Sequence, residues 1–292
     1  MTSPGHTAFT GAGGITLAAT RHGSAGAPVM LLHGGGQTRH AFDKSARRIA
    51  AAGFLALTVD QRGHGESGRA RDGAYSFFEF AADAEAVARH LQAATGRKPI
   101  AIGASMGGLA ALIAQGTGAD KPFAGLVLVD ITPDMNRDGV DAVQNFMRAK
   151  ADQGFANVEE AGAAIAAYLP HRPKPKSLAG LAKNLRLGPD KRYYWHWDPV
   201  YMNGPRSIDA LAMEAVGAAK AAAKVFDVPV LLVRGSNSEL VGEEQLARFK
   251  AMAPEAEFAD VRGARHMVAG DDNDAFSAVI VSFLARHFAP AR

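Results

Sequence analysis

The chain has 292 residues, no cysteine, a formal net charge of +3, 48% apolar residues and 21% charged residues. This composition is typical of a globular protein with a large core, and it excludes disulfides and thiolate metal sites. The first residues lack the basic and apolar segments of a signal peptide, and no apolar run approaches the roughly 18–20 residues that span a bilayer. We therefore expect a cytoplasmic protein without a membrane span.

Apolar, strand-like segments alternate with segments of helical periodicity along most of the chain. The predicted strands cover residues 14–20, 28–34, 54–60, 98–105, 125–131, 228–235 and 256–263. The predicted helices cover residues 77–91, 106–115, 243–252 and 274–288. Strands that are apolar on both faces and separated by helices predict an α/β fold, with a mostly parallel, twisted sheet flanked by helices.

Residues 132–224 interrupt this alternation, because they contain no comparable strand. Ala-rich stretches broken by prolines predict a mainly helical cap there, inserted into a core domain of residues 1–131 and 225–292. Open α/β folds bind ligands at the carboxyl end of the sheet, so we expect the cap to act as a lid. The basic stretch 171–176 is interpreted as a solvated loop. No nucleic-acid partner is expected, because no nucleic-acid-binding motif accompanies this stretch.

Ser105 is the strongest candidate for a nucleophile. It lies in the sequence Gly-Ala-Ser-Met-Gly (103–107), a G-x-S-x-G pattern between a predicted strand and a predicted helix. That context is typical of a nucleophile elbow, a sharp turn that projects the serine hydroxyl from the start of a helix. The helix N-terminus also favours the negative charge that develops beside the serine.

Acyl transfer also needs N–H donors that hold the oxyanion. The backbone N–H of Met106 is predicted to supply one of them. The other is expected from the glycines that follow His33, and Gly35 is the candidate because its missing side chain allows close approach. A phosphate-binding loop is the alternative for these glycines, but the sequence has neither a Walker lysine nor G-x-G-x-x-G spacing there.

His266 is the predicted base. It follows the last predicted strand and lies downstream of Ser105, which fits the chain order Ser…acid…His of one class of catalytic triad. His64 precedes Ser105 in a turn punctuated by glycines and is interpreted as structural. The acidic run 271–274 is interpreted as a cap of the last helix rather than a metal site, so no metal is expected.

Together these segments resemble the α/β-hydrolase fold family, in particular its capped, lysophospholipase- and esterase-like bacterial members. The matching pieces occur in the family's order and cover the chain apart from the insertion: LLHGGG, DQRGHGES, IGASMGG, LLVRGSNSELV and GARHMVAGD. The resemblance implies Ser105 as nucleophile, His266 as base and then acid, and an oxyanion hole from Gly35 and Met106. Members with aspartate at the nucleophile position open epoxides or carbon–halogen bonds, and the serine here argues against both reactions. Arg265 stands beside the base, where relatives commonly carry glycine.

The third member of the triad has two candidates. Glu239 lies in the loop after strand 228–235, where most members of the family have their acid, whereas Asp130 ends strand 125–131, a position that some members use. The acid must accept the His266 Nδ1–H and hold the imidazole in one tautomer. We favour Glu239 and keep Asp130 as the alternative, because a carboxylate at a strand end can also serve merely to bind loop N–H groups.

The aromatic stretch 192–202 can line a substrate pocket or anchor the cap on the core. A helical run there would place Tyr194, Trp197 and Tyr201 on one face. We take Tyr194, Trp195 and Trp197 as candidate pocket residues.

The sequence thus predicts a serine hydrolase that needs no cofactor and cleaves a small or medium carboxylic ester or lactone. Three alternatives remain open: hydrolytic C–C bond cleavage, cofactor-free perhydrolysis, and a small-molecule receptor that carries the triad and hydrolyses slowly. The expected partner is a small ester-like molecule, and the sequence does not indicate an oligomeric state.

Overall fold

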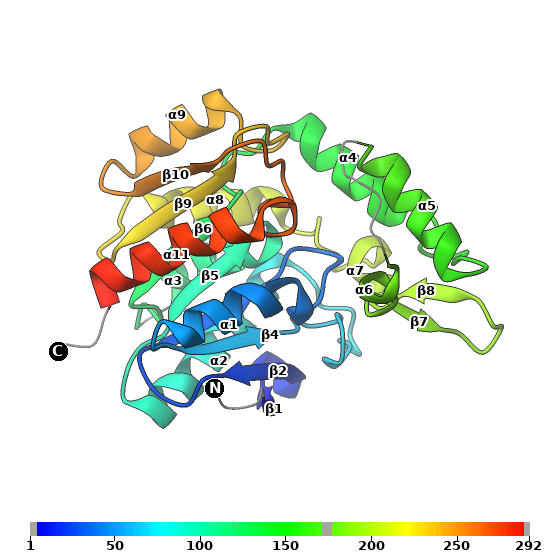
Figure 1. Cartoon of the computed structure of the whole chain (residues 1–292), viewed down its shortest axis with the longest axis horizontal. Helices are drawn as coiled ribbons and strands as arrows, with labels where there is room; N and C mark the ends of the chain where they lie inside the picture. Colours follow the sequence, from blue (N-terminus) through cyan, green and yellow to red (C-terminus); the bar gives the residue numbers. More distant parts are fainter. Residues whose placement is uncertain (1–4, 119, 171–176, 289–292) are drawn as a thin grey trace.

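The computed structural model describes residues 5–118, 120–170 and 177–288, and a sheet of eight strands forms its centre (Figure 1). The strands are β1 (Gly5–Thr10), β2 (Thr16–His22), β3 (Pro28–Leu32), β4 (Leu55–Val59), β5 (Ile100–Ala104), β6 (Gly125–Val129), β9 (Val230–Gly235) and β10 (Glu257–Val261). Their order across the sheet is β1-β2-β4-β3-β5-β6-β9-β10. The six strands from β4 to β10 run parallel, and β1 and β2 add an antiparallel edge. Every residue of β3, β4, β6 and β9 is buried, as expected for parallel strands covered on both faces.

Some helices cover the two faces of this sheet, and others belong to the cap. In chain order they are α1 (Asp43–Ala51), α2 (Phe77–Thr95), α3 (Met106–Thr117), α4 (Arg137–Arg148), α5 (Val158–Tyr168), α6 (Ala179–Ala182), α7 (Val200–Asn203), α8 (Ala212–Ala223), α9 (Glu243–Met252), α10 (Val268–Asp271) and α11 (Asn273–Phe288), with 3-10 turns η1 (Ala12–Gly14) and η2 (Arg39–Phe42). Helices α1 and α11 pack on one face, in front of the sheet in Figure 1. Helices α2, α3, α8 and α9 contribute to the apolar cluster on the other face.

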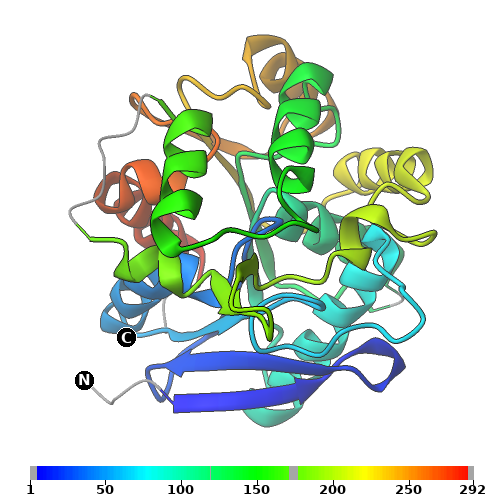
Figure 2. The same cartoon turned by 90° about the vertical axis from the view of Figure 1, so that its right-hand side faces the viewer.

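The cap elements are α4, α5, α6 and α7 together with a small hairpin of β7 (Leu185–Leu187) and β8 (Tyr193–Trp195). They lie over the carboxyl ends of the parallel strands. When the molecule is viewed from the cap side, α4 and α5 lie in front of the sheet (Figure 2). Helix α8 packs on α3 and buries alanines in the cluster beneath the sheet. The division of the chain into core and cap at residues 132 and 224 stays a prediction.

The predicted α/β fold class is confirmed, and the predicted strands and helices are present with ends that shift by a few residues. Two local differences stand out. Residues 5–10 form β1, which pairs with β2 through backbone hydrogen bonds that the sequence pattern does not reveal. The helical run expected over residues 192–202 is wrong, because Tyr193–Trp195 is a strand held by β7 and the helix α7 begins at Val200.

Buried ion pairs fix the loops that follow β3 and β4. The Arg39 guanidinium binds Asp60, which is fully buried, and Glu66, at 2.5 Å. Arg62 binds Asp83 from α2, with nitrogen–oxygen distances of 2.6 and 2.8 Å. Buried charges need such partners, because an unpaired one would be strongly destabilising. These pairs tie the loops under the cap to one another and to α2.

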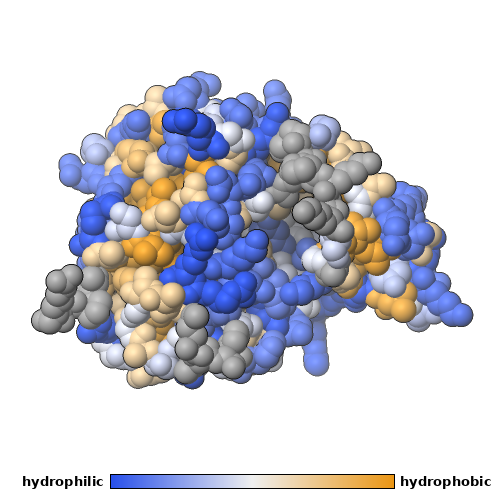
Figure 3. Space-filling view, in the orientation of Figure 1, coloured by the Kyte–Doolittle hydropathy of each residue, from blue (hydrophilic) through white to orange (hydrophobic). Residues whose placement is uncertain are grey.

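The surface and the helices agree with a protein whose apolar residues lie mainly inside. On the face shown in Figure 3 hydrophilic residues cover the middle, while apolar residues gather on the left and in a smaller patch on the right. Among the helices of the described ranges, none has the length and apolar character that crossing a membrane requires. The basic stretch 171–176, interpreted above as a solvated loop, lies outside the described residues.

Candidate active site

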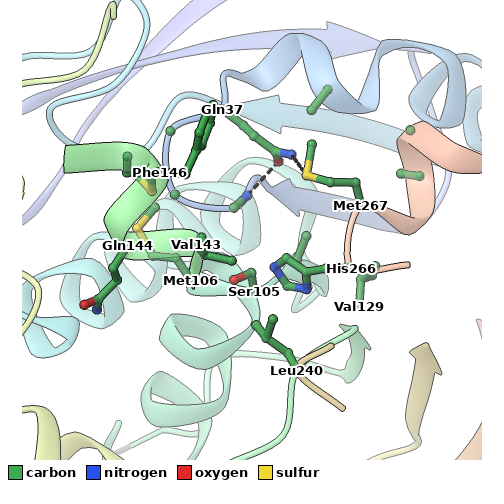
Figure 4. A pocket seen from close by; sticks show the side chains of 18 of the residues that line it. Gln37, Ser105, Met106, Val129, Val143, Gln144, Phe146, Leu240, His266 and Met267 are labelled. Carbon is green, nitrogen blue, oxygen red and sulfur yellow. Dashed lines mark hydrogen bonds between the residues drawn. The ribbon is translucent and has the colours of Figure 1, made fainter. Parts of the chain in front are cut away.

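A cavity of about 840 Å³ lies between the carboxyl edge of the sheet and the cap elements. The core contributes Gly35, Ser105 and His266 to its wall, and apolar and aromatic side chains of the cap form much of the rest (Figure 4). A volume of this size is typical of a small-molecule site, which usually has an apolar wall and a few convergent polar groups.

Ser105 occupies a strained turn between β5 and α3. Its φ is 47° and its ψ is −117°, a backbone conformation that residues with a side chain rarely adopt. The turn is tight enough that a Cβ built on Gly103 would lie 2.5 Å from the backbone of Gly107. The Ser105 hydroxyl makes no hydrogen bond with any residue that the structure describes, and the side chain lies next to the His266 ring in the view of Figure 4. This is the local geometry of a nucleophile elbow.

Two backbone N–H groups beside Ser105 have no acceptor among the described residues. The Gly34 N–H donates to Gln37 Oε1 at 3.1 Å, shown as a dashed line in Figure 4, and the Gly36 N–H donates to His64 Nε2 at 3.2 Å. The N–H between them, that of Gly35, has no acceptor within the described part of the chain. Met106 is the first residue of α3, so its N–H has no acceptor inside the helix.

Two buried histidines hold the loop that carries Gly35. His33 accepts the Gln61 N–H at 3.0 Å, and His64 accepts the Gly36 N–H. In each ring the other nitrogen, Nδ1, then carries the proton and donates to a backbone carbonyl. Burial lowers the pKa of His33 and the pKa of His64 to about 3, so both rings are neutral at physiological pH. The structural role predicted for His64 is confirmed.

Asp130 faces the imidazole of His266. The Asp130 Oδ2 atom lies 2.8 Å from His266 Nδ1 and also accepts the Ser238 hydroxyl at 2.6 Å, while Oδ1 accepts the Gly235 N–H at 3.0 Å. Asp130 is fully buried and has a φ of 50°. A carboxylate acceptor at Nδ1 requires the proton on that nitrogen, which leaves His266 Nε2 as a proton acceptor.

Glu239 does not occupy the place favoured for it from the sequence. Its carboxylate pairs with Arg265 Nη1 at 2.6 Å and accepts the His266 backbone N–H at 3.4 Å, rather than the ring N–H. The Glu239 side chain is 42% exposed, whereas Asp130 is buried. The acid that contacts the imidazole is therefore Asp130, because its strand ends directly under the ring. Arg265 points to Glu239, so the two charges beside His266 offset each other.

Ser238 is a supporting residue that the sequence did not identify. Its hydroxyl donates to Asp130 and accepts the Leu240 and Val241 N–H groups, at 3.1 and 3.0 Å. It therefore joins the loop after β9 to the carboxylate after β6. A serine one residue before a candidate acid gives no sequence signal for this role.

The aromatic stretch divides between cavity and surface. Trp195 and Trp197 line the cavity, as does Tyr201. Tyr194 does not, and its hydroxyl donates to Asp190 at 2.7 Å on the exposed side of the hairpin. The inclusion of Tyr194 among the pocket residues is corrected for a simple reason: successive side chains of a strand point to opposite faces, so Tyr194 and Trp195 cannot both face inward.

The acidic run 271–274 contributes to a helix start, as predicted. The Asp272 side chain accepts the Ala275 N–H at 3.0 Å at the first turn of α11, and Asp271 accepts the Arg265 N–H at 2.9 Å. Asp274 forms an exposed ion pair with Arg48 at 2.6 Å.

Comparison with known families settles which family this fold and site represent. A family model described as serine aminopeptidase, S33, matches residues 23–273. The chain belongs to this α/β-hydrolase family. It is therefore a hydrolase, and the family resemblance inferred from the motifs is confirmed.

Curated relatives extend over most of the chain. Esterase Rv0045c of Mycobacterium tuberculosis is 28% identical over 253 residues, which cover 81% of this chain and 75% of that protein. A 2-(acetamidomethylene)succinate hydrolase of Mesorhizobium japonicum is 30% identical and covers 88% of this chain and 87% of its own length. The non-heme chloroperoxidase CPO-A1 of Kitasatospora aureofaciens is 28% identical, with 89% and 92% covered.

Solved structures agree on the architecture. The crystal structure of E-2-(acetamidomethylene)succinate hydrolase superimposes with a TM-score of 0.81 at 23% identity, covering 97% of this chain and 99% of that one. A structure of the M. tuberculosis esterase Rv0045c has a TM-score of 0.72 at 26% identity, with 97% and 93% covered.

Proposed function

We propose that this hydrolase cleaves a carboxylic ester or lactone through an acyl-enzyme on Ser105, with His266 as base and Asp130 as the acid of the triad. The observation that carries the proposal is the 2.8 Å contact between buried Asp130 and His266 Nδ1, at the wall of the cavity that Ser105 also lines. Similarity to esterase Rv0045c supports ester hydrolysis as the reaction.

Acylation begins when His266 Nε2 takes the proton of the Ser105 hydroxyl. The serine Oγ then forms a bond to the acyl carbon, and the carbonyl oxygen takes the negative charge in contact with the Gly35 and Met106 N–H groups. Asp130 stabilises the imidazolium and does not take its proton. When the carbon–oxygen bond to the leaving group breaks, His266 gives its proton to the departing alcohol.

Deacylation repeats these steps with water as the nucleophile. His266 takes a proton from water, the hydroxide attacks the acyl carbon, and the bond to Ser105 Oγ breaks as the serine regains its proton. The products are the carboxylic acid and free enzyme. Every proton is carried by His266, and no step of this cycle draws on a cofactor.

The cavity favours a substrate of medium size with an apolar acyl group. Its cap side is lined by apolar side chains, which include Val143, Phe146, Met147, Ile165 and Leu169. An acetyl group would leave most of this apolar surface in contact with water, whereas a longer chain would bury it at about 25 cal/mol per Å². We therefore expect butyryl and hexanoyl esters to be better substrates than acetyl esters.

The experiment that tests the proposal combines labelling with turnover. A fluorophosphonate probe should modify Ser105, and Ser105→Ala should abolish both the labelling and the multiple turnover of p-nitrophenyl butyrate. A Ser105→Ala enzyme with full activity would refute the mechanism. One covalent turnover without release of the acid would instead favour the small-molecule receptor.

Perhydrolysis is a second candidate, favoured by the similarity to the non-heme chloroperoxidase CPO-A1. Hydrogen peroxide would replace water in deacylation, and the acyl group would leave Ser105 as a peracid. Peracid formation from an ester and hydrogen peroxide, compared between wild type and Ser105→Ala, measures this reaction directly. Equal rates in the two proteins would exclude it.

A further inference from the structure

The Tyr201 hydroxyl is a polar group of the cavity that the triad leaves unused. Tyr201 lies on α7, is 3% exposed and lines the cavity. Its hydroxyl makes no hydrogen bond with any described residue, although buried tyrosine hydroxyls usually have a partner. A buried donor that faces a cavity without an acceptor from the protein indicates that a bound molecule supplies the acceptor.

This hydroxyl lies beside the candidate oxyanion hole. A Cβ built on Gly35 would be 2.7 Å from the Tyr201 oxygen, so the phenol stands directly against the Gly35 backbone. A side chain at position 35 would push Tyr201 away. Glycine is therefore required here for the approach of the tyrosine as well as for the approach of a substrate.

The Tyr201 ring is held in place by other aromatic rings. It packs edge-on against His64, with centroids 5.0 Å apart, and against Phe80 and Trp197 at 5.9 and 6.0 Å. His64 also accepts the Gly36 N–H, so one imidazole fixes both the oxyanion loop and the tyrosine. Donors fixed in advance in this way stabilise a transition state without the cost of reorganisation.

Tyr201 is in the protonated form that a donor requires. Burial raises the pKa of its hydroxyl above the ordinary value, and the charge of Asp209 acts in the same direction. The phenol therefore keeps its proton at neutral pH and is not a base.

We propose that the Tyr201 hydroxyl donates a third hydrogen bond to the acyl carbonyl oxygen, from the cap side, in both tetrahedral intermediates. The inference rests on the proposed function. In acylation, the π electrons of the carbonyl move onto this oxygen as Ser105 Oγ attacks, and they return when the bond to the leaving group breaks. In deacylation they move as water attacks, and return when the bond to Ser105 Oγ breaks. Tyr201 keeps its own proton throughout. The oxyanion hole then combines two N–H donors of the core with one hydroxyl donor from α7 of the cap.

The test uses Tyr201→Phe, which removes the hydroxyl and keeps the ring. Single-turnover release of p-nitrophenolate from the butyrate ester gives the acylation rate, and mass spectrometry of the quenched acyl-enzyme gives the deacylation rate. Both should fall roughly 10- to 100-fold with little change in KM. This lies below the 10²–10³-fold cost of a single oxyanion donor, because two backbone donors remain. A trifluoromethyl ketone, which forms a charged tetrahedral adduct on Ser105, should bind more weakly by a similar factor.

Tyr75→Phe is the matched control. Tyr75 packs against Tyr201 with centroids 6.1 Å apart, but its hydroxyl is bonded to Asp198 at 2.7 Å and does not line the cavity. This variant should lower the melting temperature and leave both rate constants close to those of the wild type. Tyr201→Phe should show the reverse pattern, because its hydroxyl has no acceptor in the described protein.

Each other outcome identifies what has failed. Loss of acylation alone would place the hydroxyl on the leaving group, and a change in KM alone would place it on a remote part of the substrate; either result overturns the inference. Unchanged acylation and deacylation rates in Tyr201→Phe would also overturn the inference, as would a lowered melting temperature of this variant. If the wild type itself neither turns over the ester nor reacts with a fluorophosphonate at Ser105, the proposed function fails and the inference falls with it.

Discussion

The loops after β6 and β9 end neighbouring parallel strands, yet they place their carboxylates in opposite environments. Asp130, after β6, is fully buried and accepts a backbone N–H, a serine hydroxyl and the ring of His266. Glu239, after β9, is 42% exposed and pairs with Arg265. Both are acids at the edge of the sheet where ligands bind, so position along the chain does not separate them. The hydrogen bonds around them do, because they fix the buried Asp130 carboxylate toward His266, whereas Glu239 is partly exposed and pairs with Arg265.

Of the changes to the two carboxylates, Asp130→Asn has the larger expected effect. The amide keeps the shape of the side chain but can present its NH₂ group to His266 Nδ1, which then favours the wrong tautomer. In the serine proteases the equivalent change costs about 10⁴ in kcat, and we expect a loss of that order here. Steady-state kinetics with p-nitrophenyl butyrate measure it.

The loss of kcat in Asp130→Asn can be interpreted only if the variant is folded. The circular dichroism and melting temperature of Asp130→Asn should show that the sheet is intact, and fluorophosphonate labelling of Ser105 should be slowed in parallel with turnover. Activity within about tenfold of the wild type would mean that His266 does not depend on Asp130.

Three buried histidines predict that the stability of the protein depends on pH. Burial lowers the pKa of His33, His64 and His196 to about 3, whereas the unfolded chain has the ordinary value of 6.5. Between these values the unfolded state binds more protons, so the free energy of unfolding falls as pH decreases below about 6.5. From pH 7.5 to 5.5 each histidine should contribute a loss on the order of 1.4 kcal/mol, about 4 kcal/mol together.

Urea unfolding at the two pH values measures this loss. His64→Gln is the informative variant, because an amide oxygen can still accept the Gly36 N–H but does not titrate. Whatever its stability at pH 7.5, its loss on going to pH 5.5 should be smaller than that of the wild type by about 1.4 kcal/mol. An unchanged loss would show that His64 is protonated in the folded protein.

The same contrast explains which parts of the site the sequence predicts. Ser105 and the N–H of Met106 belong to one strand–turn–helix segment, so their arrangement follows from a local pattern of five residues. The parallel sheet is likewise visible, because strands buried on both faces are apolar throughout. His266 is identified by its order in the chain after the last strand, and its role stays a proposal.

The preference for Glu239 failed because it depended on distances between segments that are far apart in the chain. Whether a carboxylate reaches His266 depends on the position of the loop that carries the histidine relative to β6 and β9, and loop sequences do not encode that position locally. The expectation that Tyr194 lines the pocket failed for the same reason. Its direction is set by the pairing of β8 with β7, a contact between strands too short to show an alternating pattern.

The smallest expected effect is that of Glu239→Gln. A partly exposed ion pair contributes about 0–1 kcal/mol to stability, and the amide oxygen can still accept from Arg265. We therefore expect kcat to change by less than about threefold and the melting temperature to stay nearly the same. The variant is measured beside Asp130→Asn with the same ester, since each is the isosteric replacement of one carboxylate.

The double variant Asp130→Asn/Glu239→Gln tests whether the two carboxylates act independently. If Asp130 alone orients the imidazole, the effects of Asp130→Asn and Glu239→Gln should add in free energy, because Glu239 contacts His266 only through its backbone N–H. If the two acids shared the role, removing Glu239 would cost much more in the absence of Asp130 than in its presence. A loss of 10³ or more in kcat for Glu239→Gln alone would instead identify Glu239 as the acid of the triad. The loop after β9 would then have to move so that the Glu239 carboxylate displaces Asp130 from His266 Nδ1.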